Sequence, residues 1–408
     1  MNIWIIDHYA VPPEYYPLAR QTIFAKKLNE KGHTATIFCA SSVHNSDKNL
    51  SNGAKLYREE IVDGVKYVFV TCKGYRGNGI KRVLNMLEFA RKLPKVCKNY
   101  EKPDAVLACS MTLQACKQGI KLARKYKAKA VAQITDLWPE ALVEYGIAGK
   151  NSLPVLYLRR IEKWIYINAD SVVISAEGMY RYVIEQGWDK TIPKEKYVYI
   201  NNGIDLAAFD YNKDHFKLED KELEDPDFYN IVYTGSIRIV NDLSGVLEVA
   251  KCIKNPKIRF LIWGQGDQLE ELKQRVIDEN ITNVFFKGPV EKKYIPYITS
   301  KAFVNFAHNQ PSKMFKYGIS FNKVFDYLAA GRPILCDFPC PYNPVLSAKA
   351  GVSVDSADPN DIALQIERFT AMDSTNIDRY CTNARIGAKQ YDFEVLTQKL
   401  LDVFTGVP

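Results

Sequence analysis

The sequence has little that would support a metal centre, a disulfide framework or a membrane span. Its nine cysteines are scattered without a CxxC pair, and the two closest together are Cys336 and Cys340. We therefore expect the reduced thiols of a cytoplasmic protein and no metal site. No segment reaches the roughly 18 uninterrupted apolar residues that a transmembrane helix needs. The first residues, MNIWIIDHYAVPP, lack a basic start, so we expect no signal peptide.

The length of 408 residues exceeds what one ordinary hydrophobic core accommodates and predicts two domains of roughly 200 residues each. Charge is divided unevenly between the two halves. Residues 1–200 contain 31 Lys and Arg against 19 Asp and Glu, whereas residues 201–408 contain 24 against 28. This asymmetry indicates an anionic partner for the first half alone.

Short apolar runs alternate with amphipathic segments throughout the first half. Such alternation is typical of right-handed βαβ units, in which helices cover both faces of a parallel sheet. The predicted strands are NIWIID, TATIFCA, KYVFV, DAVLAC, KAVAQI and SVVIS, and the predicted helices are ARQTIFAKKLNEKGH and residues 80–98, 112–125 and 154–168.

The alternation stops at YVYINNGIDLAAF, where Asn-Gly signals a turn, and then restarts. We therefore predict an α/β protein of two facing, doubly wound, Rossmann-like domains with a cleft between them. The expected domains are residues 1–200 and 201–385, and a last helix at about 386–404, in the segment 386–408, crosses back to the first domain. Ligands of such sheets bind at the loops that follow the carboxyl ends of the strands. The predicted strands of the second half are YNIVYTGS, IRFLIWGQG, NVFFKG, KAFVNFA and RPILCDF, and its helices include LSGVLEVAKCIK and QLEELKQRVIDEN.

Two glycine-containing loops follow predicted strands of the second half. Gly235, in YTGSIRIVND, would let backbone N–H groups approach an anion at a helix N-terminus, and Arg238 would add a charge-assisted bond to a phosphate. The alternative is a tight turn with a solvated arginine. Gly264 and Gly266, in WGQGD, allow a sharp turn that is also common in purely structural loops, and the third glycine of a dinucleotide fingerprint is missing.

The segment SFNKVFDYLAAGRP predicts a short helix from Phe321 to Ala330 with Ser320 as its N-cap. Lys323 and Asp326 lie on one side of its first turns. A lysine at the positive end of the helix dipole costs stability, which favours an anion such as a diphosphate as its partner. Asp326 would then accept hydrogen bonds from vicinal hydroxyl groups. The alternative is a simple ion pair between the two side chains.

The segment SFNKVFDYLAAGRPIL resembles the SPNKLFDYLAAGKPII segment of retaining nucleotide-sugar glycosyltransferases of family 4, which have the GT-B fold of two facing Rossmann-like domains. Further motifs are similar, in order and spacing, to the capsule and O-antigen branch of that family along nearly the whole chain. These motifs are HYAVPPEYYPLARQTIFAKKLNEKGH, TDLWPE, INNGID, YTGSI, LIWGQG and VFFKGPV.

The resemblance implies a donor site in the second half. Gly235 would approach the donor diphosphate, Lys323 would neutralise it, and Asp326 would hold the nucleotide ribose beside Asn322. The predicted donor-binding residues are Gly235, Ser236, Arg238, Gly264, Gly266, Asn322, Lys323 and Asp326.

Two positions depart from the family pattern. Gly318 stands where the family commonly has a glutamate that contacts hydroxyl groups of the donor sugar. Ser236 stands where an arginine commonly follows the glycine of the donor domain, and Arg238 would substitute for it. Both departures leave the identity of the donor sugar open.

The resemblance also implies an acceptor side in the first half. Asp136, in TDLWPE, falls where many members keep a histidine or aspartate near the acceptor. Arg20 belongs to the first helix, and His8 and Glu140 lie in the loops expected at the same edge of the sheet. Asp136, Lys323 and Arg238 are the predicted catalytic residues.

A basic amphipathic segment, Lys73 to Lys98, carries eight Lys and Arg residues and the single acid Glu88. Apolar residues recur in it at helical spacing. They are Val83, Leu84, Leu87 and Ala90, and the stripe is widened by Met86, Phe89 and Leu93. Such a helix can lie on an anionic bilayer. The alternative is an ordinary surface helix whose apolar stripe covers the sheet. We do not expect nucleic acid as a partner, because aromatic interleaving and a recognisable binding module are missing.

The resemblance implies transfer of a sugar from a nucleotide diphosphate sugar, expected to be a UDP-sugar, to a lipid-linked glycan without a cofactor or metal ion. We expect a cytoplasmic enzyme held peripherally at the inner face of the cell membrane. Two alternatives stay open. An epimerase of free nucleotide sugars would need acid and base groups, and His8 and His308 are the only histidines in the loops expected to line the cleft. A catalytically inactive partner subunit is compatible with Gly318.

Overall fold

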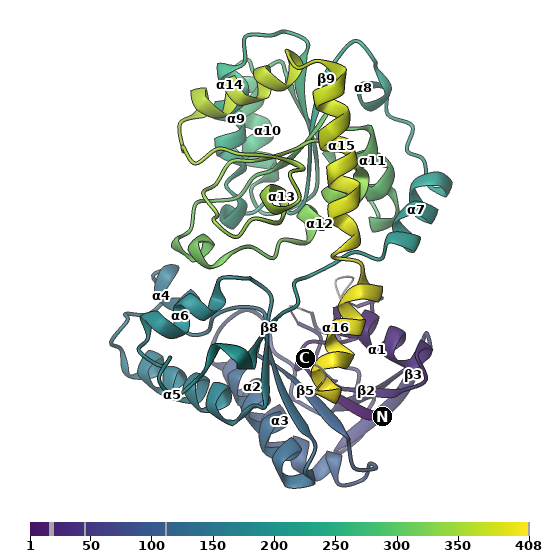
Figure 1. Cartoon of the computed structure of the whole chain (residues 1–408), viewed down its shortest axis with the longest axis vertical. Coiled ribbons are helices and arrows are strands. Elements are labelled where there is room, and N and C mark those ends of the chain that lie inside the picture. The colour runs from purple at the N-terminus through teal and green to yellow at the C-terminus, as the bar shows by residue number, and fades with distance from the viewer. Residues whose placement is uncertain (16–19, 45, 111, 407–408) are drawn as a thin grey trace. The chain divides into compact units, whose positions relative to one another are not determined.

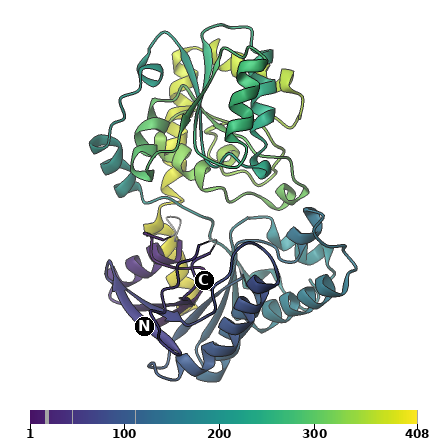
Figure 2. The same ribbon diagram turned by 180° about the vertical axis from the view of Figure 1, so that it is seen from behind.

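The computed structural model describes residues 1–15, 20–44, 46–110 and 112–406. The chain forms two compact units, shown from two sides in Figures 1 and 2. The first consists of Met1–Asn201 with Leu396–Pro408, and the second of Asn202–Val395. Within the described ranges, every helix is too short or too polar to cross a bilayer.

The first unit is built on an eight-stranded sheet in the order β3-β4-β2-β1-β5-β6-β7-β8. All neighbouring strands are parallel except β3 and β4, which form an antiparallel hairpin. Central strand β5 is buried along its whole length, as expected for a strand covered on both faces. The strands are β1 (Asn2–Ile6), β2 (Thr34–Ala40), β3 (Tyr57–Val62), β4 (Val65–Val70), β5 (Ala105–Cys109), β6 (Lys129–Ile134), β7 (Ser171–Ile174) and β8 (Tyr197–Tyr199).

Helices connect these strands, as the alternation in the sequence predicts. Three of them, α2, α3 and α5, form one layer in which α3 packs against both of the others (Figure 1). The helices of this unit are α1 (Arg20–Glu30), α2 (Ile80–Cys97), α3 (Leu113–Tyr126), α4 (Glu140–Glu144), α5 (Leu153–Asn168) and α6 (Met179–Glu185), with the short 3-10 helix η1 (Lys194–Lys196).

The second unit is built on a six-stranded, wholly parallel sheet in the order β11-β10-β9-β12-β13-β14. The chain starts at β9, adds β10 and β11 on one side, and then continues with β12 on the other side. The strand order therefore reverses between β9 and β12. The strands are β9 (Tyr229–Thr234), β10 (Ile258–Trp263), β11 (Val284–Gly288), β12 (Val304–Ala307), β13 (Ile334–Cys336) and β14 (Gly351–Ser353).

A main core lies on one side of this sheet, where α9 and α14 pack against each other and apolar side chains of β9, β10 and β12 are buried. The other side carries a smaller cluster that includes Trp263 and Ile298. The helices are α7 (Leu206–His215), α8 (Lys221–Glu224), α9 (Leu243–Cys252), α10 (Leu269–Asp278), α11 (Ile295–Lys301), α12 (Asn322–Ala330), α13 (Pro344–Ser347), α14 (Pro359–Thr370) and α15 (Ser374–Lys389), with 3-10 helices η2 (Ile239–Asn241), η3 (Lys292–Tyr294) and η4 (Lys313–Tyr317).

The structure confirms the α/β class with two doubly wound parallel sheets. The prediction of one helix at 386–404 is wrong, because two helices, α15 and α16 (Phe393–Thr405), meet there. The chain between them bonds to Ile204, whose N–H donates to Tyr391 O (2.9 Å) and whose carbonyl accepts from Phe393 N (3.0 Å). These bonds hold the backbone extended, so the helix cannot continue. The segment grouped with the first unit starts at Leu396.

Candidate functional site

The switch between β9 and β12 places several polar groups at the carboxyl edge of the second sheet. Open parallel sheets bind ligands at this place because two loops diverge there and leave room. The loops after β9, β12 and β13 and the N-terminal ends of α9 and α12 converge on it. Lys323, the residue that the sequence singled out, lies in the first turn of α12.

Helix α12 begins at Asn322, and its N-cap residue is Phe321. The prediction of Ser320 as the N-cap is therefore wrong, since the helix starts one residue later than expected. The buried Ser320 Oγ bonds to none of the residues that the structure describes. Because no side chain caps α12, its first backbone N–H groups are left without a side-chain acceptor. Such a helix end is suited to an anion.

Lys323 is directed toward the strand edge. Its Nζ donates to Tyr233 Oη (3.0 Å) and to the carbonyl oxygen of His308 (3.1 Å), and it lies 4.2 Å from the centre of the Tyr233 ring. Burial lowers the pKa of this half-buried lysine to about 7, although the charge of Asp337 acts in the opposite direction. An ammonium group has three donors, and the two bonds leave one of them for a ligand.

Asp326 lies one turn further along α12 and is half-buried. Burial raises the pKa of its carboxyl group to about 6, and the charge of Lys292 opposes this shift. Across the described parts of the chain, no ion pair joins Asp326 to Lys323, so the interpretation of the two as a simple pair is wrong. The carboxyl group is free to accept hydrogen bonds from hydroxyl groups of a ligand.

Sequence reasoning missed a buried pair behind Lys323. His308 follows β12, and its Nδ1 bonds to the carboxylate of Asp337, which follows the neighbouring strand β13. His308 Nε2 donates to the carbonyl of Asp242 at the start of α9 (2.7 Å). Burial alone would lower the pKa of His308, but the charge and hydrogen bond of Asp337 and the Asp242 carbonyl together raise it. Through hydrogen bonds at both ring nitrogens, His308 links the start of α9 to the ends of β12 and β13, and its own backbone carbonyl accepts the bond from Lys323.

The glycines of the two predicted loops serve the packing of one loop on the other. A Cβ atom on Gly264 would lie 1.8 Å from the carbonyl oxygen of Gly235, and one on Gly266 would lie 1.9 Å from that of Ile237. The N–H groups of Gly235 and Ile237 bond to Trp263 O (3.0 Å) and Gln265 O (2.9 Å). This geometry supports the structural interpretation of Gly264 and Gly266, and their contact with a donor stays a prediction.

The neighbouring polar residues of the β9 loop are accessible. The side chain of Arg238 is exposed and pairs with none of the described residues. Ser236 is exposed and accepts a bond from Asn241 Nδ2 on its Oγ (2.6 Å). Asn322 is exposed at the first position of α12. Gly318, the departure from the family pattern, has φ 109°, a conformation that a glutamate would adopt only with strain.

The acceptor-side residues are described within the first unit alone. His8 is buried, its Nε2 bonds to Asn85 Oδ1 (2.7 Å), and burial lowers its pKa to about 3, so it is neutral. Arg20 Nη2 donates to the carbonyl of Ile200 (2.7 Å). Glu140 pairs with Arg159 at 2.5 Å. Asp136, in contrast, is exposed in the loop after β6. Roles for all four toward an acceptor stay predictions.

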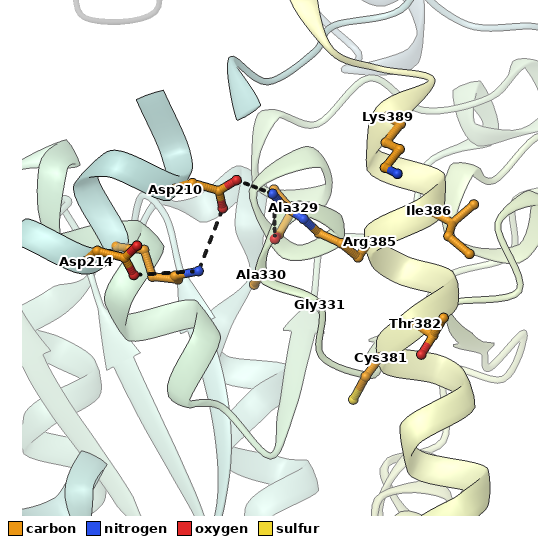
Figure 3. A pocket seen from close by; sticks show the side chains of 11 residues that line it. Asp210, Asp214, Ala329, Ala330, Gly331, Cys381, Thr382, Arg385, Ile386 and Lys389 are labelled. Atoms are coloured by element: carbon orange, nitrogen blue, oxygen red, sulfur yellow. Dashed lines mark hydrogen bonds and ion pairs between the residues drawn. The ribbon is translucent and has the colours of Figure 1, made fainter. Parts of the chain in front are cut away.

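A separate surface pocket of about 730 Å³ lies at the opposite, C-terminal end of α12, between α7 and α15 (Figure 3). Arg385 donates to the Ala329 carbonyl (2.8 Å) and pairs with Asp210, which also approaches Lys213 at 3.7 Å. Lys213 also approaches Asp214 at 3.7 Å, so Arg385 and Lys213 are both paired with carboxylates, and this end of the helix dipole is negative. We therefore place the anion site at the N-terminal end of α12.

Comparisons with known proteins identify the family of the chain. The family model described as Glycosyltransferase Family 4 matches residues 22–208, and the model described as Glycosyl transferases group 1 matches residues 214–385. The chain is 26% identical over 214 residues to WcaI of Escherichia coli (strain K12), named as a colanic acid biosynthesis glycosyl transferase. It is 25% identical over 219 residues to the glycosyltransferase WbjE of Pseudomonas aeruginosa.

These alignments cover 51% of the chain in both cases, and 51% of WcaI and 50% of WbjE. The chain thus spans about half the length of the curated relatives it matches. Among solved structures, that of HepE from Anabaena in complex with UDP has a TM-score of 0.67 at 12% identity, with all of both chains covered. Its likeness concerns the fold, which is the GT-B fold predicted from the sequence. Matched in both halves, the chain belongs to the glycosyltransferases of family 4.

Proposed function

We propose that the protein is a retaining glycosyltransferase that moves a sugar from a nucleotide diphosphate sugar, specifically a UDP-sugar, to a lipid-linked glycan of a cell-surface polysaccharide. The observation that carries the proposal is Lys323, half-buried at an uncapped helix N-terminus beside the switch point of the second sheet. A cation and free N–H groups at this place suit a diphosphate. The HepE structures in complex with UDP and with UDP-glucose support the choice of donor.

The chemical task is to stabilise charge on the leaving diphosphate. The bond from the anomeric carbon to the diphosphate oxygen breaks, and a bond from that carbon to an acceptor hydroxyl oxygen forms. The hydroxyl proton is released to the departing diphosphate or to solvent. Lys323, Arg238 and the first N–H groups of α12 would hold the diphosphate without a metal ion, and Asp326 would accept bonds from the ribose. Retention is proposed from family membership, and we assign no nucleophile.

Incubation with a panel of UDP-sugars, with and without a lipid-linked glycan, tests this function. We expect release of UDP that depends on the acceptor. A changed sugar nucleotide without acceptor would instead identify an epimerase. Donor binding without any turnover across acceptors would identify an inactive partner subunit.

The pH dependence of donor use should report on Lys323. Its ammonium form exists below a pKa of about 7 and is lost above it. Because kcat/KM reflects the free enzyme, we expect kcat/KM for the donor to fall about tenfold per pH unit above that pKa. Lys323→Arg keeps its charge at every accessible pH, so this decline should disappear in the variant. The same decline in both proteins would assign it to another group.

Helix α2 supports the proposed membrane-bound acceptor. The alternative interpretation, in which the apolar stripe of α2 packs on the sheet, does not hold for Val83, Leu84 and Leu87, because all three are exposed, together with Ile80. The helix buries a different face, which includes Phe89 and Leu93. These four exposed apolar residues, which we term the α2 patch, lie among the exposed basic residues Lys81, Arg91, Lys95 and Lys98. An apolar stripe flanked by basic residues is typical of helices that lie on anionic bilayers.

Neutralising the basic residues of α2 should release the protein from anionic vesicles. Each basic residue near such a surface contributes about 1 kcal/mol. We therefore expect the combined Lys81→Gln, Arg91→Gln, Lys95→Gln and Lys98→Gln variant to bind phosphatidylglycerol vesicles up to roughly 1000-fold more weakly at physiological salt. Co-sedimentation with vesicles measures this.

The matched control replaces four basic residues of the second unit, Lys221, Lys254, Lys257 and Lys273, by glutamine. It changes net charge equally and should bind like the parent protein. Equal losses of vesicle binding in the two variants would show that overall charge, and not the position of the α2 residues, determines binding.

A further inference from the structure

A second cluster of exposed apolar side chains lies on the first unit, between the end of α4 and the first turns of α5. It comprises Tyr145, Ile147, Leu153, Leu156 and Tyr157, which we term the 145–157 patch. Ile147 is 70% exposed and Leu153 is 83% exposed. Single exposed apolar residues are common on protein surfaces, but five within 13 residues of sequence are unusual. Leu153, Leu156 and Tyr157 share one face of α5 at spacings of three and four residues, and clustered exposed apolar side chains mark interaction sites.

The packing of α5 keeps these side chains exposed to solvent. Helix α5 turns its other face to the core, where the buried carboxylate of Glu162 accepts hydrogen bonds from Tyr166 and Tyr182, both at 2.8 Å. Arg159 on the same face pairs with Glu140 of α4. Rotating α5 to bury Leu153 and Tyr157 would break these buried bonds, and the burial of two apolar side chains would not offset that cost. The patch is therefore a fixed surface of the folded unit.

Basic residues outnumber acids around the patch, although the charges of Asp136 and Glu144 act on Tyr145. Residues 145–161 contain no acid, and Lys150 and Arg160 are exposed there. Helices α2, α3 and α5 together carry twelve Lys and Arg residues and two glutamates. One of these, Glu88, pairs with Lys92, and the other is the buried Glu162. A second copy of the chain would place like charges against each other on this layer, whereas an anionic surface complements it.

The patch and the α2 patch lie at the same end of one layer. Helices α2 and α5 flank α3 on the sheet (Figure 1). In right-handed crossover connections a helix runs antiparallel to the strands it joins, so its first turns lie near the carboxyl edge of the sheet. Ile80 to Leu87 form the first half of α2, and Leu153 to Tyr157 the start of α5. Both apolar groups therefore lie toward the edge at which the exposed Asp136 follows β6.

We propose that the 145–157 patch inserts into the headgroup region of an anionic bilayer, as a second contact beside the α2 patch. Two contacts on one rigid layer fix the orientation of the unit on the membrane, whereas one contact leaves it free to rotate. The carboxyl edge of the first sheet is thereby held next to the bilayer. This orientation serves the proposed function, because a lipid-linked acceptor presents its sugar at that height, but vesicle binding itself requires no donor and no turnover.

Vesicle partitioning of the full-length protein at low and high salt tests the proposal. Salt screens the attraction of basic residues but does not weaken apolar insertion. We expect the parent protein to keep a measurable bound fraction on phosphatidylglycerol vesicles in about 1 M NaCl. In the Leu153→Ser, Tyr157→Ser variant this salt-resistant fraction should fall to what the α2 patch alone retains, and the variant should partition about tenfold less at physiological salt, from the loss of two inserted side chains.

The matched control is Ile277→Ser, Leu364→Ser, which replaces two exposed apolar residues of the second unit and should partition like the parent. Circular dichroism and UDP binding by calorimetry check that each variant is folded. Unchanged partitioning of Leu153→Ser, Tyr157→Ser would overturn the proposal. So would a stable protein complex or dimer that this variant dissociates while vesicle binding stays intact, because the patch would then be a protein interface. Membrane binding without any transferase activity would refute the proposed function and leave this contact standing.

Discussion

Lys323→Ala should reduce acceptor-dependent release of UDP by about 100- to 1000-fold, the usual effect of removing one group that stabilises charge in a transition state. Lys323 is the cation that reaches the carboxyl edge of the second sheet, between Tyr233 and the His308 carbonyl. Its loss leaves the diphosphate with the N–H groups of α12 and Arg238. The fold should persist, because burial disfavours the charged form of this lysine and its removal relieves that cost.

Steady-state kinetics measures the turnover of Lys323→Ala, and a thermal melt measures whether its fold is preserved. Lys257→Ala is the matched control, since Lys257 immediately precedes β10 and so lies at the opposite edge of the same sheet. It should be fully active. Turnover of Lys323→Ala equal to that of this control would remove Lys323 from the mechanism.

Gly264→Ala should destabilise the second unit by roughly 3 kcal/mol or more, the sum expected for steric overlap and backbone strain. The added Cβ would lie 1.8 Å from the Gly235 carbonyl oxygen, and φ at this position is 156°, which side chains other than glycine rarely adopt. The contact is with backbone, so no side-chain rotation relieves it. For a unit of about 200 residues this corresponds to a fall in Tm of about 6–12 °C.

Differential scanning calorimetry measures the change, and Gly74→Ala is the control, because a Cβ there meets no atom within 4 Å. Gly74→Ala should leave Tm within about 1–2 °C of the parent, in the range of ordinary surface substitutions. Equal stability of the two variants would show that the β9 and β10 loops are not packed as described. The packing of these loops is what positions Gly235 and Arg238.

Sequence periodicity predicted the fold where strands are buried on both faces. Runs such as NIWIID and IRFLIWGQG are continuous because helices cover both sides of the sheet. β3 was missed because it is an edge strand with alternating exposure, YREEIV, which carries no continuous apolar run. β14 was missed because its residues, GVS, form no apolar run, whereas the equally short β13, ILC, is apolar throughout. The break between α15 and α16 depends on bonds to Ile204, which lies far away in sequence.

The candidate site was predicted in part. The helix that carries Lys323 and Asp326 has a local signal in SFNKVFDYLAAGRP. The two hydrogen-bond partners of Lys323 have no such local signal in the sequence. They are a tyrosine of β9 and a carbonyl after β12, and the strand order brings them together. The pair of His308 and Asp337 is likewise a product of the pairing of β12 with β13.

In helix α2, the spacing of apolar residues predicted the helix but not which of its faces is buried. Apolar spacing identified a stripe at Val83, Leu84 and Leu87, but spacing does not tell which face of a helix meets the sheet. The buried face is set by Phe89, Leu93 and a hydrogen-bonded Asn85, whose amide donates to Ser42 and to the Lys73 carbonyl.

Titration calorimetry that compares UDP with uridine measures most directly whether the second unit binds a nucleotide through its phosphates. The account predicts that the parent protein binds UDP at least about tenfold more tightly than uridine, since charge-assisted bonds to the two phosphates add to the contacts of the base and ribose. It also predicts that Lys323→Ala removes most of this difference. Equal affinity for UDP and uridine, or a preference for UDP that is undiminished in Lys323→Ala, would contradict it.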